Sequence, residues 1–82
     1  MALCLIAYDL RKPEFDYTGL YSKLEELGAK RVQESVWMLQ STETAKDLRN
    51  QLKDYFHKKD RLLVAVVASW SSRKAMTDIK TL

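Results

Sequence analysis

Hydrophobic residues along the chain form continuous runs and helical spacings. The runs at 3–8 and 62–68 contain no charged residue and are followed by polar segments, as expected of strands buried on both faces. Between them, apolar residues recur at steps of three and four, first at Tyr17, Leu20, Tyr21, Leu24 and Leu27. This spacing predicts an amphipathic helix that has Asp16 or Thr18 as its N-cap and ends at Gly28.

The centre of the chain predicts a strand pair followed by a second helix. Residues 30–40 contain two apolar stretches, and the polar residues 33–35 between them indicate a turn or a bulge. A second amphipathic segment follows, with apolar residues at Ala45, Leu48, Leu52, Tyr55 and Phe56. We expect this helix to start with Ser41 or Thr42 as its N-cap and Glu43 in its first turn. The pattern of the tail at 69–82 fits a short helix, an extra strand or disorder.

The element order predicts an α+β protein with the ferredoxin-like arrangement βαββαβ. In this arrangement both helices cover one face of an antiparallel sheet, and the first and third strands lie in its centre. We expect one domain over residues 1–82, with its core at about 2–68 and a C-terminal tail at 69–82. Because the first and last strands are apolar on both faces, a partner subunit is the simplest cover for the other face, and the tail is a segment that two subunits could exchange.

The composition limits the ways in which this chain can be stabilised. A chain of 82 residues buries a small core, and with one cysteine, Cys4, it cannot form a disulfide framework. With His57 as the only histidine, a Cys and His metal site is not expected. Homodimerisation remains as the way to bury more apolar surface. The lone cysteine, which we expect to be buried and inert, fits a reducing cytoplasm, and the sequence predicts neither a signal peptide nor a membrane span.

The first apolar run stops at Asp9, and two cations follow. Asp9 reads either as a residue that turns the chain at the strand end or as a carboxylate that binds a ligand there. Arg11 and Lys12 are either solvated loop residues or phosphate-binding cations beside that carboxylate. The net charge of +3 is compatible with nucleic acid but does not indicate it by itself.

Three short motifs resemble one known family. They are Tyr8-Asp9 at the end of the first strand, Leu27-Gly28 at the end of the first helix, and the stretch RVQESVW at 31–37. Together they are similar to the small CRISPR adaptation proteins of the Cas2 type and to the related virulence-associated protein D and SinR-like proteins, over roughly residues 3–68. The resemblance implies a ferredoxin-like homodimer. Some members are metal-dependent nucleases acting on RNA or double-stranded DNA, and others bind nucleic acid as scaffolds.

The resemblance also implies roles for individual residues. Asp9 would meet its symmetry mate near the dimer axis, and the two would hold a divalent cation such as Mg²⁺. Arg31 matches the basic position of the family, although it also reads as an ordinary arginine at a strand edge. Ser35, if it lies close to Asp9, would orient a water or a phosphate. Trp37, two residues further on, should face the same way and is expected to pack, as is Tyr8.

Two hypotheses follow from the sequence. In the first, the chain is a small cytoplasmic homodimer that binds RNA or DNA, with Asp9 as the catalytic metal ligand and Arg11, Lys12, Arg31 and Ser35 as nucleic-acid-binding residues. The activity would be metal-dependent phosphodiester hydrolysis. In the second, the chain is a non-catalytic dimeric interaction or scaffold module, because no second acid or base is visible and this fold hosts many functions.

Overall fold

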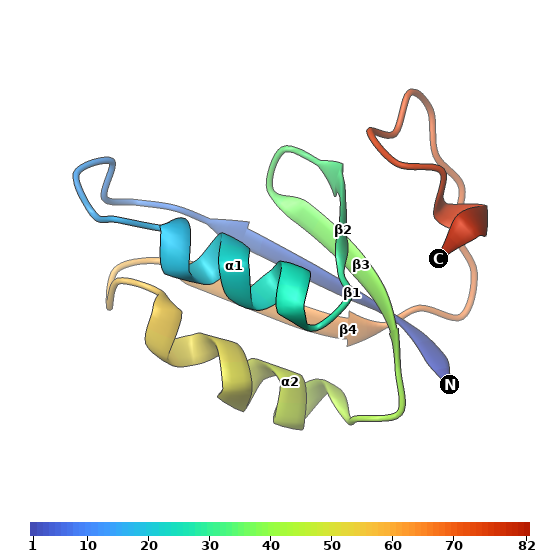
Figure 1. Ribbon diagram of the computed structural model, residues 1–82, viewed down its shortest axis with the longest axis horizontal. Coiled ribbons are helices and arrows are strands. Elements are labelled where there is room, and N and C mark those ends of the chain that lie inside the picture. The colour runs from blue at the N-terminus through green and yellow to red at the C-terminus, as the bar shows by residue number, and fades with distance from the viewer.

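The computed structural model describes the backbone of residues 1–82 and all side chains except that of Thr81 (Figure 1). The elements are β1 (Ala2–Asp9), α1 (Thr18–Glu26), β2 (Lys30–Gln33), β3 (Val36–Ser41), α2 (Ala45–Leu52) and β4 (Arg61–Val66). Short 3₁₀ turns, η1 (Lys53–Tyr55) and η2 (Ile79–Thr81), follow α2 and end the tail. The strands form one antiparallel sheet in the order β2-β3-β1-β4. This confirms the ferredoxin-like prediction, with β1 and β3 in the centre.

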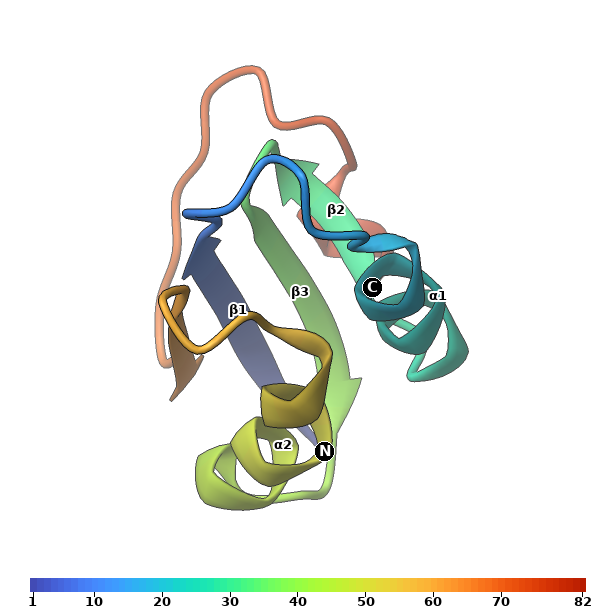
Figure 2. The ribbon, with the colours of Figure 1, turned by 90° about the vertical axis from the view of Figure 1, so that its left-hand side faces the viewer.

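The strict alternation of β1 separates the two faces of the sheet. Figure 2 shows both helices on one face of the sheet. Cys4, Ile6 and Tyr8 are buried on this face. The helices contribute four fully buried leucines to this core: Leu20, Leu24, Leu48 and Leu52. Burial also raises the pKa of the Cys4 thiol, which agrees with the prediction that it is inert.

The chain's own tail covers part of the face that the helices leave open. Val32, Met38 and Ile79 form a second buried cluster there. The Met76 amide donates to the Val32 carbonyl at 2.8 Å, so the tail follows the outer edge of β2. The sequence reasoning assigned this whole face to a partner subunit, and that assignment needs correction on the β2 and β3 side. On β4, Leu63 remains 60% exposed.

Several element boundaries differ from the sequence prediction. α2 begins later than expected, because Thr44 is its N-cap and accepts a hydrogen bond from the Asp47 amide at 3.1 Å. Ser41 instead ends β3. Tyr17 occupies the N-cap position of α1 without a side-chain bond, while the Asp16 carboxylate accepts from the Thr18 amide just before the helix.

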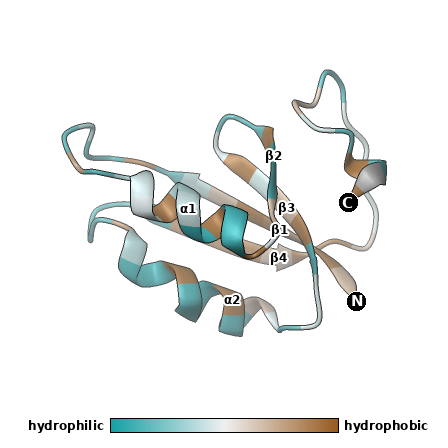
Figure 3. Cartoon of the chain, in the orientation of Figure 1, coloured by the Kyte–Doolittle hydropathy of each residue, from teal (hydrophilic) through white to brown (hydrophobic). Residues whose placement is uncertain are grey.

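Other local predictions are confirmed. Gly28 follows α1 with a φ of +85°, the left-handed conformation that a glycine adopts without strain. The polar residues at 33–35 mark a bulge in β2 and the turn into β3. The hydropathy colouring in Figure 3 shows apolar stretches along β1, β3 and β4, a mostly hydrophilic β2, and mainly hydrophilic loops at 10–17 and 57–60. Of the helices that the structure describes, none has the length and apolar character to cross a membrane.

Candidate functional site

The carboxylate of Asp9 lies at the end of β1, on the face opposite the helices. Its neighbour Tyr8 is buried on the helix side, so alternation turns Asp9 outward. The antiparallel register places Arg61, the first residue of β4, directly opposite Asp9. The Arg61 Nη1 and Asp9 Oδ2 atoms are 3.6 Å apart, and both side chains are more than half exposed. An exposed ion pair of this length is weak, so the Asp9 carboxylate remains open to another ligand.

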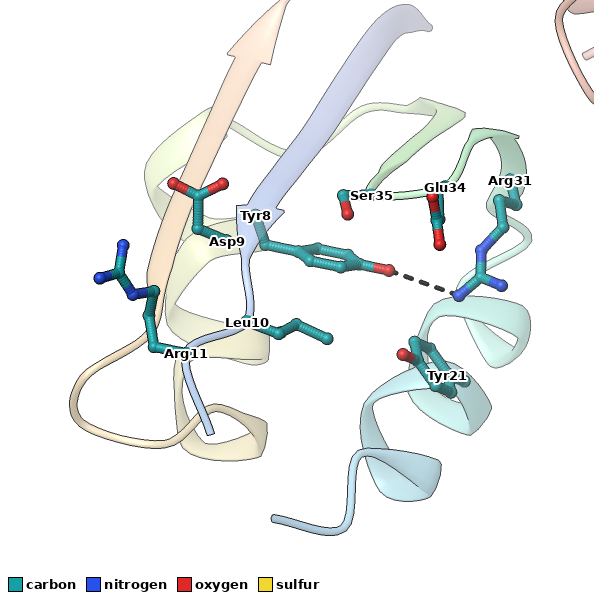
Figure 4. A pocket seen from close by; sticks show the side chains of 8 residues that line it. All are labelled: Tyr8, Asp9, Leu10, Arg11, Tyr21, Arg31, Glu34 and Ser35. Atoms are coloured by element: carbon teal, nitrogen blue, oxygen red, sulfur yellow. Dashed lines mark hydrogen bonds between the residues drawn. The ribbon is translucent and has the colours of Figure 1, made fainter. Parts of the chain in front are cut away.

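A cleft of about 600 Å³ opens beside Asp9 (Figure 4). Its lining residues come from the end of β1, from α1 and from the turn between β2 and β3: Tyr8, Asp9, Leu10, Arg11, Tyr21, Arg31, Glu34 and Ser35. The structure thereby brings together four of the five residues that the sequence singled out. The fifth, Lys12, does not line the cleft.

Aromatic rings hold the Arg31 guanidinium at the inner wall of the cleft. Its central carbon lies 4.7 Å from the ring centroid of Tyr21 and 4.8 Å from that of Trp37. Its Nη2 donates a long hydrogen bond of 3.5 Å to the hydroxyl of Tyr8. The Nε atom is buried and has no hydrogen-bond partner among the described residues. Arg31 is therefore a cation held in a fixed position at the cleft wall, and such a cation suits an anionic ligand.

Tyr8 and Trp37, which both contact the Arg31 guanidinium, are themselves buried and joined by a hydrogen bond. Each is 5% exposed, and the indole Nε1 of Trp37 donates to the Tyr8 hydroxyl at 2.9 Å. Both side chains therefore pack, as the sequence predicted, and neither ring is free to stack on a base. Ser35 belongs to the turn rather than to β3, and its carbonyl accepts from the Tyr8 amide at 3.1 Å. This bond ties the turn to the end of β1.

The cleft has two sides of different character. Figure 4 shows the Tyr8 hydroxyl pointing toward Arg31, whereas the carboxylate of Asp9 and the guanidinium of Arg11 point to the other side. Asp9 and Arg31 thus line the same cleft from separate positions. A phosphate held at Arg31 and a cation held at Asp9 would be neighbours in the cleft without sharing the same ligands.

Sequence reasoning missed two charged residues of this region, Arg61 and Glu34. Arg61 follows from topology, because the first residue of β4 pairs with the last residue of β1 in the observed register. Glu34 lines the cleft from the turn between Arg31 and Ser35, a place that the sequence had marked only as an interruption of the strand pair. The sequence feature that could have identified Glu34 is its position between Arg31 and Ser35, which were both predicted site residues.

The residues of one chain fit only part of a divalent-cation site. The described side chains contain no group of three or more His, Cys, Asp or Glu residues placed to hold a metal. Mg²⁺ prefers six oxygen ligands, and Asp9 supplies one carboxylate with the Arg61 cation beside it. A cation at Asp9 would therefore need oxygens from a second carboxylate, from a phosphate or from water.

Comparison with known families adds to this geometry. The family model described as CRISPR associated protein Cas2 matches residues 1–75, which include every strand, both α-helices and the whole cleft. No solved structure matched the chain. The family match covers most of the chain and agrees with the antiparallel ferredoxin-like sheet. The chain belongs to the Cas2 family.

Proposed function

We propose that this chain forms a homodimer that binds nucleic acid and hydrolyses phosphodiester bonds with a divalent cation held at Asp9. The observation that carries the proposal is the cleft, because it combines an exposed carboxylate at a strand end with the ring-held cation of Arg31. The Cas2 family is known for endoribonuclease-type members, and this supports a nuclease rather than another phosphate-binding activity.

Phosphate recognition follows from the two arginines of the cleft. Arg31 lines the cleft with its guanidinium held against two aromatic rings, and guanidinium groups bind phosphate through paired N–H donors. Arg11 lies in the exposed segment after Asp9, where it can reach a backbone phosphate outside the cleft. These contacts would position the strand without reading its sequence.

A second copy of the chain would complete the cation site. Asp9, Ala7 and Leu63 share the outer face of the sheet, because Ala7 pairs with Leu63 and Asp9 pairs with Arg61. Leu63 is 60% exposed there, so apolar surface lies on the same face as the carboxylate. The Cas2 family is typically dimeric. A dimer through this face would bring two Asp9 carboxylates into one neighbourhood.

The roles of the residues then follow from their chemistry. The two Asp9 carboxylates would hold Mg²⁺, which stabilises charge on a phosphoryl oxygen and promotes attack by water. Arg31 would bind and orient a phosphate from the inner wall of the cleft. Ser35, which lines the same cleft, would place its hydroxyl toward a phosphate or a water. The aromatic contacts of Arg31 fix its charge before the ligand arrives, which is the preorganisation that charge stabilisation requires.

A cleavage assay tests the proposal. Labelled RNA and DNA are incubated with the native chain, with Asp9→Ala and with the control Asp54→Ala, in Mg²⁺, Mn²⁺ or EDTA. Asp54 is an exposed aspartate in η1, outside the residues that line the cleft. We expect cation-dependent cleavage that falls at least about 100-fold in Asp9→Ala and stays unchanged in the control. Unchanged cleavage by Asp9→Ala would remove Asp9 from the mechanism.

The dimer is tested separately by light scattering. Leu63→Asp places a charge on the exposed outer face of β4, whereas Tyr55→Asp places the same charge on η1. We expect a dimer for the native chain and for Tyr55→Asp, and a monomer for Leu63→Asp. A native chain that is monomeric at all concentrations would contradict the two-carboxylate site.

One observation favours a second candidate function, a scaffold that binds nucleic acid without cutting it. The Asp9 carboxylate already faces Arg61, and such a pair needs no metal. A scaffold would bind RNA or DNA in EDTA with an affinity that weakens as the salt concentration rises, because phosphate contacts release counterions. It would leave the labelled strands intact with every cation.

A further inference from the structure

Three hydrogen-bond donors converge on the carboxylate of Asp60, which immediately precedes β4. The backbone amide of Arg11 donates to its Oδ1 at 2.6 Å. The hydroxyl of Tyr17 and the backbone amide of His57 donate to its Oδ2, at 2.6 and 2.8 Å. Both oxygens are thereby occupied by short hydrogen bonds, which are the strong type for a charged acceptor.

Two of these donors come from the segment that leaves Asp9. Arg11 lies two residues after Asp9, and Tyr17 ends the same segment at the start of α1. They are 49 and 43 residues away from Asp60 along the chain. Within the described part of the chain, the side-chain hydrogen bonds that join this segment to the region before β4 both end at Asp60. Asp60 therefore fixes both ends of an otherwise exposed loop.

The next residue, Arg61, holds the other side of the same strand end. Its guanidinium faces Asp9, and its backbone pairs with Asp9 in the sheet. The dipeptide 60–61 therefore contacts Asp9 through the arginine and the chain after Asp9 through the aspartate. Asp60 itself does not line the cleft, and both of its oxygens already accept hydrogen bonds, two from the loop and one from the His57 amide.

We propose that Asp60 is a positioning residue, which holds the segment after β1 so that Arg11 lies beside Asp9 at the edge of the cleft. This role rests on the proposed function of the cleft. Asp60 would act through the Arg11 amide and the Tyr17 hydroxyl, without touching substrate or cation. Without these bonds the ring contact between Phe15 and His57 would still tie the segment to this region, but the Arg11 guanidinium would meet a bound phosphate beside Asp9 in the right geometry less often.

The test compares Asp60→Asn with Asp54→Asn, the same chemical change at an exposed aspartate of η1. Asparagine keeps the size of the side chain but replaces one accepting oxygen with an amide donor, so it cannot accept all three bonds. A second variant, Tyr17→Phe, removes one donor and leaves the carboxylate in place. Val64→Ala in β4 serves as a variant that weakens packing without touching the loop.

We expect Asp60→Asn to lower kcat at least about tenfold, because small misplacements of reacting groups are costly, while KM changes by less than about threefold. Tyr17→Phe should lower kcat less, and Asp54→Asn and Val64→Ala should leave it unchanged. Hydrogen exchange of the Arg11 amide gives a signature independent of activity: it should accelerate in Asp60→Asn and not in Asp54→Asn.

The outcomes separate the two proposals. If the native chain cuts and Asp60→Asn cuts equally well, the positioning role is overturned and the proposed function stands. If the native chain cuts no RNA or DNA, hydrolysis is overturned, and the exchange of the Arg11 amide still decides whether Asp60 holds the segment. An Arg11 amide that exchanges at the native rate in Asp60→Asn overturns the positioning role in either case. If Asp60→Asn does not fold, Tyr17→Phe tests the role through the Tyr17 bond alone: unchanged kcat, or unchanged amide exchange of the segment in a chain that does not cut, then overturns it.

Discussion

The end of β1 and the start of β4 lie side by side, and each carries an aspartate in a different environment. Asp9 is exposed and has one ion pair, at 3.6 Å from Arg61. Asp60 is partly buried and accepts three hydrogen bonds of 2.6 to 2.8 Å. A carboxylate such as Asp60, whose oxygens already accept several hydrogen bonds, holds the neighbouring chain in place. A carboxylate such as Asp9, which is exposed and has one weak ion pair, can bind a ligand. The difference fits a structural task for Asp60 and the ligand-binding task that we propose for Asp9.

The acid–base properties of the Asp60 region agree with this division. Burial alone would raise the pKa of Asp60, but the hydrogen bonds from Arg11, Tyr17 and His57 lower it below the ordinary value. Burial, together with the hydrogen bond to the Asp60 carboxylate, raises the pKa of Tyr17 to about 12. The pair is therefore held as a carboxylate and a neutral phenol through the neutral pH range.

The largest difference in stability is expected between alanine substitutions at the two aspartates. Asp60→Ala leaves three donors without their acceptor, and we expect the free energy of unfolding to fall by about 1 to 3 kcal/mol. Asp9→Ala removes one exposed ion pair, so we expect a change below about 1 kcal/mol. Urea denaturation measures both values. Equal losses in the two variants would contradict the division of tasks.

A smaller effect on stability is expected from the Tyr17 hydroxyl at high pH. The folded chain raises the pKa of Tyr17 above its ordinary value of 10.0, so it holds the phenolic proton more tightly than the unfolded chain does. This contribution to stability is complete below about pH 10 and is lost as the pH rises toward 12. Urea midpoints measured from pH 8 to 12 should fall less steeply for Tyr17→Phe than for the native chain. Parallel pH profiles would show that the Tyr17 hydroxyl does not contribute.

The Asp60 contacts should also make the stability of the fold depend on pH in the acid range. Because the folded chain lowers the pKa of Asp60, its contribution is complete above the ordinary value of 3.8 and is lost as the pH falls through the lower, folded value. Asp60→Asn should remove this part of the acid dependence, whereas Asp54→Asn should keep it. Urea midpoints between pH 2 and 5 provide the comparison, and identical profiles for the two variants would contradict it.

The smallest effect on stability is expected from substitution of Arg61. Arg61→Ala removes an exposed ion pair, so the free energy of unfolding should change by less than about 1 kcal/mol and the change should shrink in high salt. The variant also removes a positive charge beside Asp9, which should tighten cation binding there. Weaker cation binding by Arg61→Ala would show that the arginine supports the site rather than competing with the cation.

The sequence could predict the sheet and the position of Asp9, because both depend on local patterns. Alternation in β1 and the two apolar runs are visible in the sequence, and the RVQESVW stretch carried the family resemblance that the comparison then confirmed. The predicted start of α2 was wrong because several residues before the helix, Ser41 and Thr42 among them, are acceptable N-caps. Local pattern alone does not choose between such neighbours.

The contacts of Asp60 could not be predicted, because they join residues more than 40 positions apart through loop geometry. The placement of Arg31 against two aromatic rings has the same cause, since Tyr21 and Trp37 meet only when α1 packs on β3. The conformation of the tail at 69–82 could not be predicted either. The loose three-residue spacing of Met76, Ile79 and Leu82 did not decide between a helix, a strand and disorder, yet Ile79 is buried against Val32 and Met38.

The claim that Asp9 binds a divalent cation can be tested without any assay of activity. Mn²⁺ is added to the isotope-labelled chain, and the paramagnetic broadening of amide signals is compared between the native protein and Asp9→Asn. We predict selective broadening at residues 8–11 and at Arg61, which disappears in Asp9→Asn and persists in Asp54→Asn. Broadening that is unaffected by Asp9→Asn, or that centres on another part of the surface, would contradict the account.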